Sequence, residues 1–173
     1  MKMRKLIICC LFIISFIGCG TQATYVKHEP IDSDKGIIIA ILPLQNNSPD
    51  RSFDPAGITL SDLIAAKMSV KKGFKIVERQ KIKDLLKEMK LGLAGLQDEN
   101  TAVKIGKMAG ANVIALGSFS VFDNKVLLTM RLVKVETGEI VGGAKEKGND
   151  ASNLDVLADN AAEKLADSLS AGK

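Results

Sequence analysis

The chain has 173 residues, and 46% hydrophobic against 25% charged residues is typical of a globular protein rather than a disordered one. Its formal net charge of +4 owes three positive charges to Lys2, Arg4 and Lys5, and without residues 1–18 only 21 basic residues face 20 acidic ones. Such a nearly neutral body predicts no electrostatic footprint for DNA, RNA or an anionic membrane surface. We therefore expect no nucleic-acid partner.

The chain begins with a cationic segment of five residues, and an apolar run, Leu6–Ile17, follows it directly. This order is typical of the n-region and h-region of a secretory signal peptide. As a helix the run would cover about 18 Å, whereas the hydrocarbon core of a bilayer is about 30 Å thick. A permanent transmembrane helix is therefore the weaker interpretation.

The apolar run ends in Phe16-Ile17-Gly18-Cys19, which resembles the lipobox of bacterial lipoproteins. The resemblance implies that residues 1–18 are a lipoprotein signal peptide and that Cys19 is the lipid attachment site, carrying acyl chains such as palmitate. Phe16 departs from the pattern, where an aliphatic residue is usual, so an ordinary signal peptide is the alternative. Gly20, in place of Asp, resembles the sorting signal for the periplasmic face of the outer membrane.

Residues 19–35 are polar and show no periodicity, which predicts a lipidated N-terminus and flexible linker before a folded domain over residues 36–173. The single histidine, His28, lies in this linker. All three cysteines, Cys9, Cys10 and Cys19, precede the domain. We therefore expect the domain to contain no disulfide, no thiolate metal site and no histidine base.

The domain should begin with a strand, because Gly36–Leu44 is an almost continuous apolar run of the kind found in strands buried on both faces. Asp54 and Pro55 predict the N-cap and first position of a helix that ends before Gly73. A short strand over residues 74–77 follows, and a second amphipathic helix is expected from Arg79.

After the second helix, the segment Leu91–Leu96 is an apolar loop broken by glycines. Asp98 is expected to cap a third helix that closes near Gly110. Residues 112–122 predict a long strand, and residues 123–125 a turn into a returning strand in which apolar residues alternate. A further turn at 136–138 leads to a strand over 139–144.

A regular stripe of leucine and alanine predicts a last helix over residues 154–169. The predicted order is β-α-β-α-α-β-β-β-α. This order indicates an α/β fold, a single domain with a mixed sheet and helices packed on it.

The apolar loop offers a candidate contact with a protein partner through Leu91, Leu93 and Leu96, because leucines are costly to leave in water. The alternative is that these leucines fold under onto the core.

No catalytic, cofactor-binding or metal-binding motif is complete in this sequence. Gly92 and Gly95 follow a helix rather than a strand, and Gly106-Lys107 has no Ser or Thr after it, so neither is a phosphate-binding loop. The acidic pair Asp98-Glu99 is better interpreted as helix-start charge than as a catalytic dyad. We expect no enzymatic activity and no cofactor.

Four stretches in one order, "IAILPLQNNS", "VERQKIKDLLKEM", "AGANVIALGSFS" and "RLVKVETGEIV", resemble the periplasmic domain of the CsgG family, which includes a curli secretion channel and is related to FlgO, LpoB and the N-terminal part of TolB. The resemblance implies a non-enzymatic envelope lipoprotein with an assembly or accessory role in curli-like secretion, the flagellum or a cell-wall synthase. Its envelope partner is unknown, and it can form a homo-oligomer.

The alternative that the resemblance leaves open is a subunit of an oligomeric CsgG-type secretion channel. The loop from Gln45 to Pro55 is short and has Phe53 as its only aromatic residue, so a pore constriction cannot be transferred to it.

Overall fold

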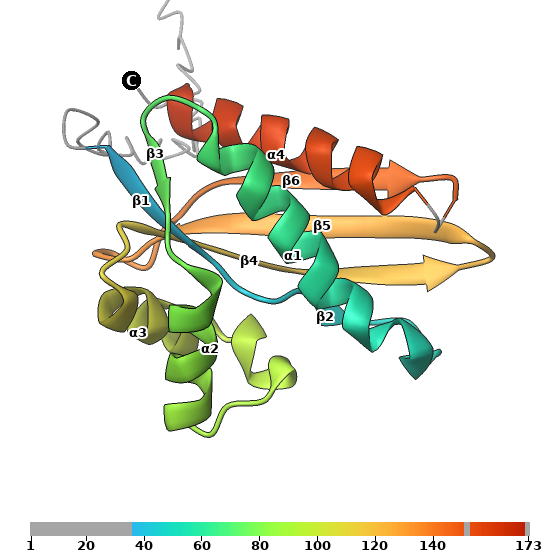
Figure 1. Ribbon diagram of the computed structural model, residues 1–173, viewed down its shortest axis with the longest axis horizontal. Coiled ribbons are helices and arrows are strands. Elements are labelled where there is room, and N and C mark those ends of the chain that lie inside the picture. Colours follow the sequence, from blue (N-terminus) through green and yellow to red (C-terminus); the bar gives the residue numbers. More distant parts are fainter. Residues whose placement is uncertain (1–35, 151–152, 172–173) are drawn as a thin grey trace, which may run out of the picture.

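The computed structural model describes residues 36–150 and 153–171, and at residues 93 and 94 it describes the backbone alone. It confirms the predicted α/β fold, since one open mixed sheet of six strands is covered by four α-helices (Figure 1). The strands are β1 (Ile37–Ile41), β2 (Gln45–Asn46), β3 (Phe74–Ile76), β4 (Val113–Phe122), β5 (Lys125–Lys134) and β6 (Ile140–Gly148). The α-helices are α1 (Asp54–Ser69), α2 (Arg79–Glu88), α3 (Glu99–Ala109) and α4 (Leu154–Ser170).

The strand order is β3-β1-β4-β5-β6, and β2 pairs with β4 beyond the end of β1. β1 is parallel to both of its neighbours, whereas β4, β5 and β6 form an antiparallel meander. The predicted central position of the first strand is confirmed. Ile37, Ile39 and Ile41 pack into one core and Ala40 into the other, so both faces of β1 are buried.

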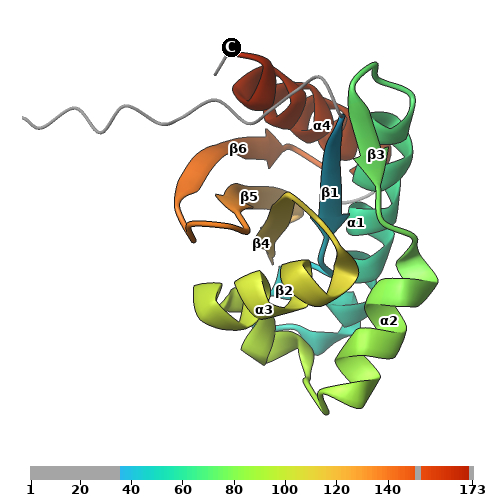
Figure 2. The same cartoon turned by 90° about the vertical axis from the view of Figure 1, so that its left-hand side faces the viewer.

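Two cores lie on opposite faces of the sheet, and Figure 2 shows α4 and α3 on opposite sides of it. Helices α1 and α4 cover one face, where α4 packs along β6 and α1 packs against α4. Helices α2 and α3 cover the other face, together with the 3-10 helix η3 (Leu93–Gln97). The second core reaches only the first half of β4 and the last part of β5, where Leu116 and Val133 are buried.

The start of the first helix differs from the prediction. Asp54 is its first residue and Phe53 its N-cap, because a 3-10 helix, η2 (Arg51–Phe53), precedes it. Asp50 caps this turn through the hydrogen bond that its carboxylate accepts from the Ser52 backbone N–H at 2.8 Å. The short strand β2 was also not predicted, since its two polar residues show no pattern of alternation.

Both ends of the third helix lie where the sequence predicts them. Asp98 accepts a hydrogen bond from the Thr101 backbone N–H at 2.7 Å, and Gly110 takes the left-handed conformation, with φ of 72°, at the C-terminal end. The β4–β5 turn is likewise confirmed, because Asp123 and Asn124 both have positive φ, as a two-residue hairpin turn requires.

The last strand is longer than the prediction of residues 139–144. β6 runs to Gly148, since its register with β5 pairs Leu128 with Glu146 and Val126 with Gly148. The added residues alternate lysine with glutamate and glycine, so no apolar alternation marks them as a strand.

Candidate functional site

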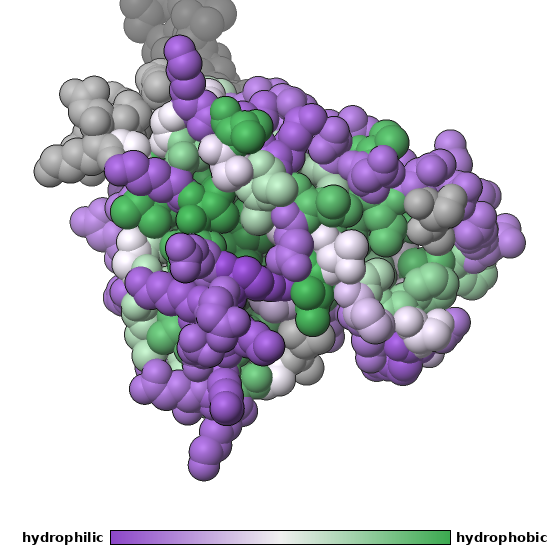
Figure 3. Space-filling model, viewed as in Figure 1, coloured by the Kyte–Doolittle hydropathy of each residue, from purple (hydrophilic) through white to green (hydrophobic). Residues whose placement is uncertain are grey.

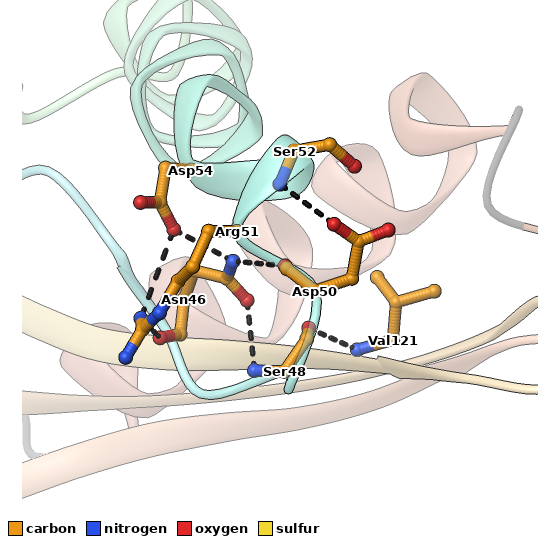
Figure 4. A network of polar contacts seen from close by, with 7 residues as sticks. All are labelled: Asn46, Ser48, Asp50, Arg51, Ser52, Asp54 and Val121. Atoms are coloured by element: carbon orange, nitrogen blue, oxygen red, sulfur yellow. Dashed lines mark hydrogen bonds and ion pairs between the residues drawn. The ribbon is translucent and has the colours of Figure 1, made fainter.

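A polar network joins the loop after β1 to the end of β4 (Figure 4). The buried Asn46 amide donates to Asp54 Oδ1 at 2.7 Å and to the Asp50 carbonyl at 2.9 Å, and its oxygen accepts from the Ser48 N–H at 2.8 Å. Ser48 Oγ in turn accepts from the Val121 N–H at 2.7 Å. The network therefore fixes the first turn of α1 against the sheet.

Backbone groups of this loop form hydrogen bonds with its charged side chains. The Ser52 backbone N–H donates to the Asp50 carboxylate and holds its pKa below the usual range. Arg51 donates to the Asn46 carbonyl at 3.2 Å and lies 3.8 Å from Asp54. Because these groups satisfy one another, the network is a structural clamp rather than a reaction site.

A groove of about 350 Å³ lies between α1 and α2, where β1 and β3 reach their carboxyl ends. In sheets with parallel strands this edge is a common place for ligand sites. Its walls are apolar at the centre and polar at the rim. The apolar residues are Pro43, Ile58, Ile82 and Leu86, and the polar residues are Asp62, Arg79, Gln80 and Lys83.

Arg79 ties the two walls of the groove together. Its Nε lies 3.1 Å from Asp62 Oδ1, and one terminal nitrogen donates to Ser61 Oγ at 2.9 Å. These contacts bridge the first residue of α2 to the middle of α1, so they join the two helices that line the groove. Lys83, one turn along α2, is exposed and has no ion pair among the described residues.

The close approach of α1 to the loop after β1 depends on Gly57. A Cβ at this position would lie 2.0 Å from the Leu44 carbonyl oxygen, which no side chain can tolerate without movement. The Leu44 N–H donates to the Gly57 carbonyl at 3.2 Å. Glycine therefore lets α1 rest directly on the backbone beneath it and sets one wall of the groove.

The sequence did not point to this groove. Ile58 lies outside the apolar stripe of the predicted first helix, and its exposed fraction is 45%. The ion pair between Asp62 and Arg79 joins residues on two different elements, and no local pattern connects them. Two of the resemblance stretches contain groove residues, since "IAILPLQNNS" includes Pro43 and "VERQKIKDLLKEM" includes Arg79 and Lys83.

The predicted contact loop lies on the α2–α3 side of the sheet. Leu96 is fully buried in the second core, and Leu91 is partly buried against it, while the side chain of Leu93 lies outside the described residues. Leu96 therefore has the position that the alternative, folding onto the core, predicts. Partner contact through Leu91 and Leu93 stays a prediction.

Cys19, the predicted lipid attachment site, also lies outside the described residues. Within residues 36–150 and 153–171, no helix combines the length and apolar character that crossing a bilayer requires. In the same part of the chain, no three His, Cys, Asp or Glu side chains gather in a way that could hold a metal ion.

Solved structures share this fold at low sequence identity. The C-terminal domain of LpoB from Escherichia coli is 23% identical with a TM-score of 0.51, and the match covers 65% of this chain and 82% of that one. Lipoprotein GNA1162 from Neisseria meningitidis is 15% identical with a TM-score of 0.56, and the match covers 77% of this chain and 99% of that one. These matches establish a common fold.

Family comparison supports the same assignment at the level of sequence. No individual curated protein sequence matches the chain. The family described as "Curli production assembly/transport component CsgG" matches residues 21–129, which is more than half of the chain. The predicted resemblance is therefore confirmed, and the protein belongs to the CsgG family.

Proposed function

We propose that the protein is a lipoprotein on the periplasmic face of the outer membrane, where it serves as a non-enzymatic assembly or accessory factor for an envelope structure. Two findings support the proposal. The family to which the chain belongs is named for an assembly and transport component, and GNA1162, which has the same fold, is itself named a lipoprotein. The structure served is curli-like secretion, the flagellum or a cell-wall synthase.

The mechanism that we propose is positional. Acyl chains on Cys19 hold the protein at the membrane, since several chains together give a stable anchor where one gives only marginal binding. Residues 19–35 then act as a linker with a reach of about 20 Å. The domain over residues 36–173 presents its surface to a partner within that reach.

The groove between α1 and α2 is the observation that carries this function. It combines an apolar floor with a polar rim that Arg79 and Asp62 brace across two helices. Such a surface grips a protein segment through a few apolar side chains, while the rim sets the register. Figure 3 shows apolar residues over α1 beside the hydrophilic surface of α2.

The charge of α2 indicates the chemistry of the partner. Two cations of α2, Arg79 and Lys83, line the groove, and one carboxylate, Asp62 of α1, faces them. Only Arg79 has a carboxylate partner on α1. We therefore infer that the groove takes an acidic protein segment that also carries apolar side chains.

The anchor is tested by mass analysis of the mature N-terminus in protein extracted from envelopes. We expect a chain that begins at Cys19 and carries acyl chains on its sulfur and its amine. A chain that begins elsewhere, or an unmodified Cys19, would overturn the anchor and with it the positional mechanism.

The accessory role is tested by complementing a deletion strain with variants. Ile58→Glu places a charge in the groove, whereas Val70→Glu is a matched control because Val70 is 80% exposed at the other end of α1. Surface-fibre export, motility and dependence on a cell-wall synthase are measured in each strain. We expect Cys19→Ala and Ile58→Glu to abolish complementation in the same assay, and Val70→Glu to retain it.

Two results of this experiment would contradict the proposal. If the deletion changes none of the three readouts, the accessory role is wrong. If Ile58→Glu complements as well as Val70→Glu does, the groove is not the partner site.

A subunit of an oligomeric CsgG-type secretion channel is the second candidate, because the family name itself includes transport. Native mass measurement of the detergent-extracted protein separates the two functions. A ring of fixed stoichiometry supports the channel, and a single copy or a complex with another chain supports the accessory factor.

A further inference from the structure

Within residues 36–150 and 153–171, no helix lies over one face of the second half of the β4–β5–β6 meander. Helices α2, α3 and η3 cover this face only near the start of β4, and β6 has its principal helix contacts with α4 on the opposite side. Side chains beyond that cover reach solvent. We define the open sheet face as Phe122, Lys125, Leu127, Thr129, Lys145 and Lys147.

Strand pairing brings these six residues together in cross-strand pairs. Phe122 pairs with Lys125, Leu127 with Lys147, and Thr129 with Lys145. Because side chains on one strand alternate between the two faces, directly paired residues point to the same side of the sheet. The three lysines therefore share one surface although 22 positions separate the first from the last.

No carboxylate belongs to the open sheet face. Glu146, which lies between its two lysines in sequence, points to the other side and pairs with Lys164 of α4 at 2.6 Å. Arg131, the next residue along β5 on this side, is already paired with Glu99 at 3.3 Å. Lys125, Lys145 and Lys147 have no ion pair within the described part of the chain.

In the part of the chain that the structure describes, the acidic groups beside this surface lie at its edges. Asp123 occupies the hairpin turn, and Asp150, which accepts from the Asn124 amide at 3.3 Å, follows β6. Asp98 and Glu99 lie at the start of α3, where Asp98 caps the helix. The centre of the open sheet face is therefore cationic, although the body as a whole is nearly neutral.

An exposed aromatic ring lies at one end of the lysines. Phe122 is the last residue of β4, and its exposed fraction is 79%. Leu127, which pairs across from Ser120, is partly buried. A ring beside lysines on a flat surface matches a lipid headgroup layer, where aromatic residues lie at headgroup depth and lysines reach phosphates.

We propose that the open sheet face binds the surface of a bilayer that contains anionic phospholipid. This inference rests on the proposed function, because the anchor on Cys19 brings that surface within reach. The orientation is compatible with the tether: Gly36, at the start of β1, lies at the end of the sheet opposite to Phe122, so the strands can lie along the membrane (Figure 1).

The expected contribution of the lysines is large enough to measure. Each lysine near an anionic membrane surface strengthens binding about five-fold at physiological ionic strength. Three lysines together should therefore strengthen it about 100-fold, and high salt should weaken it because exposed charges are screened.

The test uses the chain from residue 19 onward with Cys19→Ser, so that no acyl chain contributes. The described core residues all lie between residues 37 and 169, so this chain retains both cores. Co-sedimentation is measured with vesicles of equal parts phosphatidylethanolamine and phosphatidylglycerol, and with neutral phosphatidylcholine vesicles. Circular dichroism confirms that each variant is folded.

Two triple variants with the same change in net charge are compared. One carries Lys125→Gln, Lys145→Gln and Lys147→Gln on the open sheet face. The other carries Lys72→Gln, Lys104→Gln and Lys107→Gln, which are exposed lysines on other elements. We expect the first to lose about 100-fold in binding to anionic vesicles and the second to lose less than about five-fold, the effect of one lysine.

The outcomes separate this inference from the proposed function. Equal losses in the two triple variants, or no binding of the parent chain to anionic vesicles at low salt, would overturn the membrane contact and would leave the anchor untouched. An unacylated Cys19 in the envelope protein would overturn the anchor, whereas vesicle binding by the acyl-free chain would still support the open sheet face.

Discussion

Strand β5 carries two neighbouring leucines with opposite surroundings. Leu128 is fully buried in the core under α1 and α4, whereas Leu127 is only partly buried on the open sheet face. Neighbouring side chains on a strand point to opposite faces of the sheet, so the difference in burial comes from what covers each face. Helices α1 and α4 cover one face of the meander, and the core beneath them stabilises the fold. The other face is partly exposed to solvent, so its side chains can bind a partner.

We expect the largest loss of stability from a substitution in the core under α1 and α4. We expect Leu128→Ala to lower the free energy of unfolding by about 2–5 kcal/mol, because it removes buried methyl groups and leaves a cavity. Leu127→Ala should lower the free energy of unfolding by less than about 1 kcal/mol, because the Leu127 side chain buries little apolar surface on folding. Urea denaturation of both variants measures the difference. Equal losses would contradict the contrast between the two faces.

The next effect concerns how closely α1 rests on the sheet. Gly57→Ala should destabilise the fold by about 1–3 kcal/mol, the range found for overpacked sites, because its Cβ meets the Leu44 carbonyl. Gly92→Ala is the matched control, since a Cβ there has no atom within 4 Å. Thermal unfolding of the pair is the measurement. A Gly57→Ala protein as stable as the control would mean that α1 can shift freely.

A third prediction addresses the charge buried beneath α4. Glu146 Oε1 lies 2.6 Å from Lys164 Nζ, and no hydrogen-bond donor satisfies it otherwise within the described residues. Lys164→Met should cost about 1–2 kcal/mol, less than a fully buried pair because the lysine is half exposed. The double variant Lys164→Met with Glu146→Leu should recover most of that loss. Urea unfolding of the single and double variants decides the point, and a single variant of unchanged stability would contradict it.

We expect the smallest effect on stability at the start of α3, on the face of the sheet opposite to α1 and α4. The Thr101 backbone N–H lowers the pKa of Asp98, so the carboxylate stabilises the folded state at neutral pH. Asp98→Ala should lower stability at neutral pH. The gap should narrow as the pH falls below about 4, where the unfolded carboxyl takes up its proton first and the folded one later.

Urea unfolding of the Asp98 variant over a series of acidic pH values measures this narrowing. Asp167→Ala, an exposed substitution on α4, is the control. A gap between the wild type and Asp98→Ala that stays constant down to strongly acidic pH would show that the carboxylate is not what stabilises the start of α3.

Local patterns predicted most of the elements. The apolar run of β1, the Asp98 cap with Gly110 at the other end of α3, and the stripe of α4 each act over a few residues, so they could be identified without knowledge of the fold. The resemblance to the CsgG family was also carried by local stretches, and it is confirmed.

The sequence patterns failed to predict the strand segments that form only because they pair with another strand. β2 forms because Gln45 and Asn46 come to lie beside Ser118 and Phe119 of β4. β6 continues through Lys145 and Lys147 because β5 is long enough to pair with it. The partner of β2 is far away in sequence, and the added residues of β6 are polar, so hydrophobic alternation could not reveal these strands.

Net charge is a property of the whole chain, and it predicted no footprint for an anionic surface. A sum over residues does not record which of them share a face. The sheet register places three lysines on one side and turns Glu146 to the other, and in the same way the crossing of α1 and α2 brings Arg79 to Asp62. Helix and strand periods follow from neighbouring residues, so the sequence determines the elements. The groove and the open sheet face exist only once distant segments pack together.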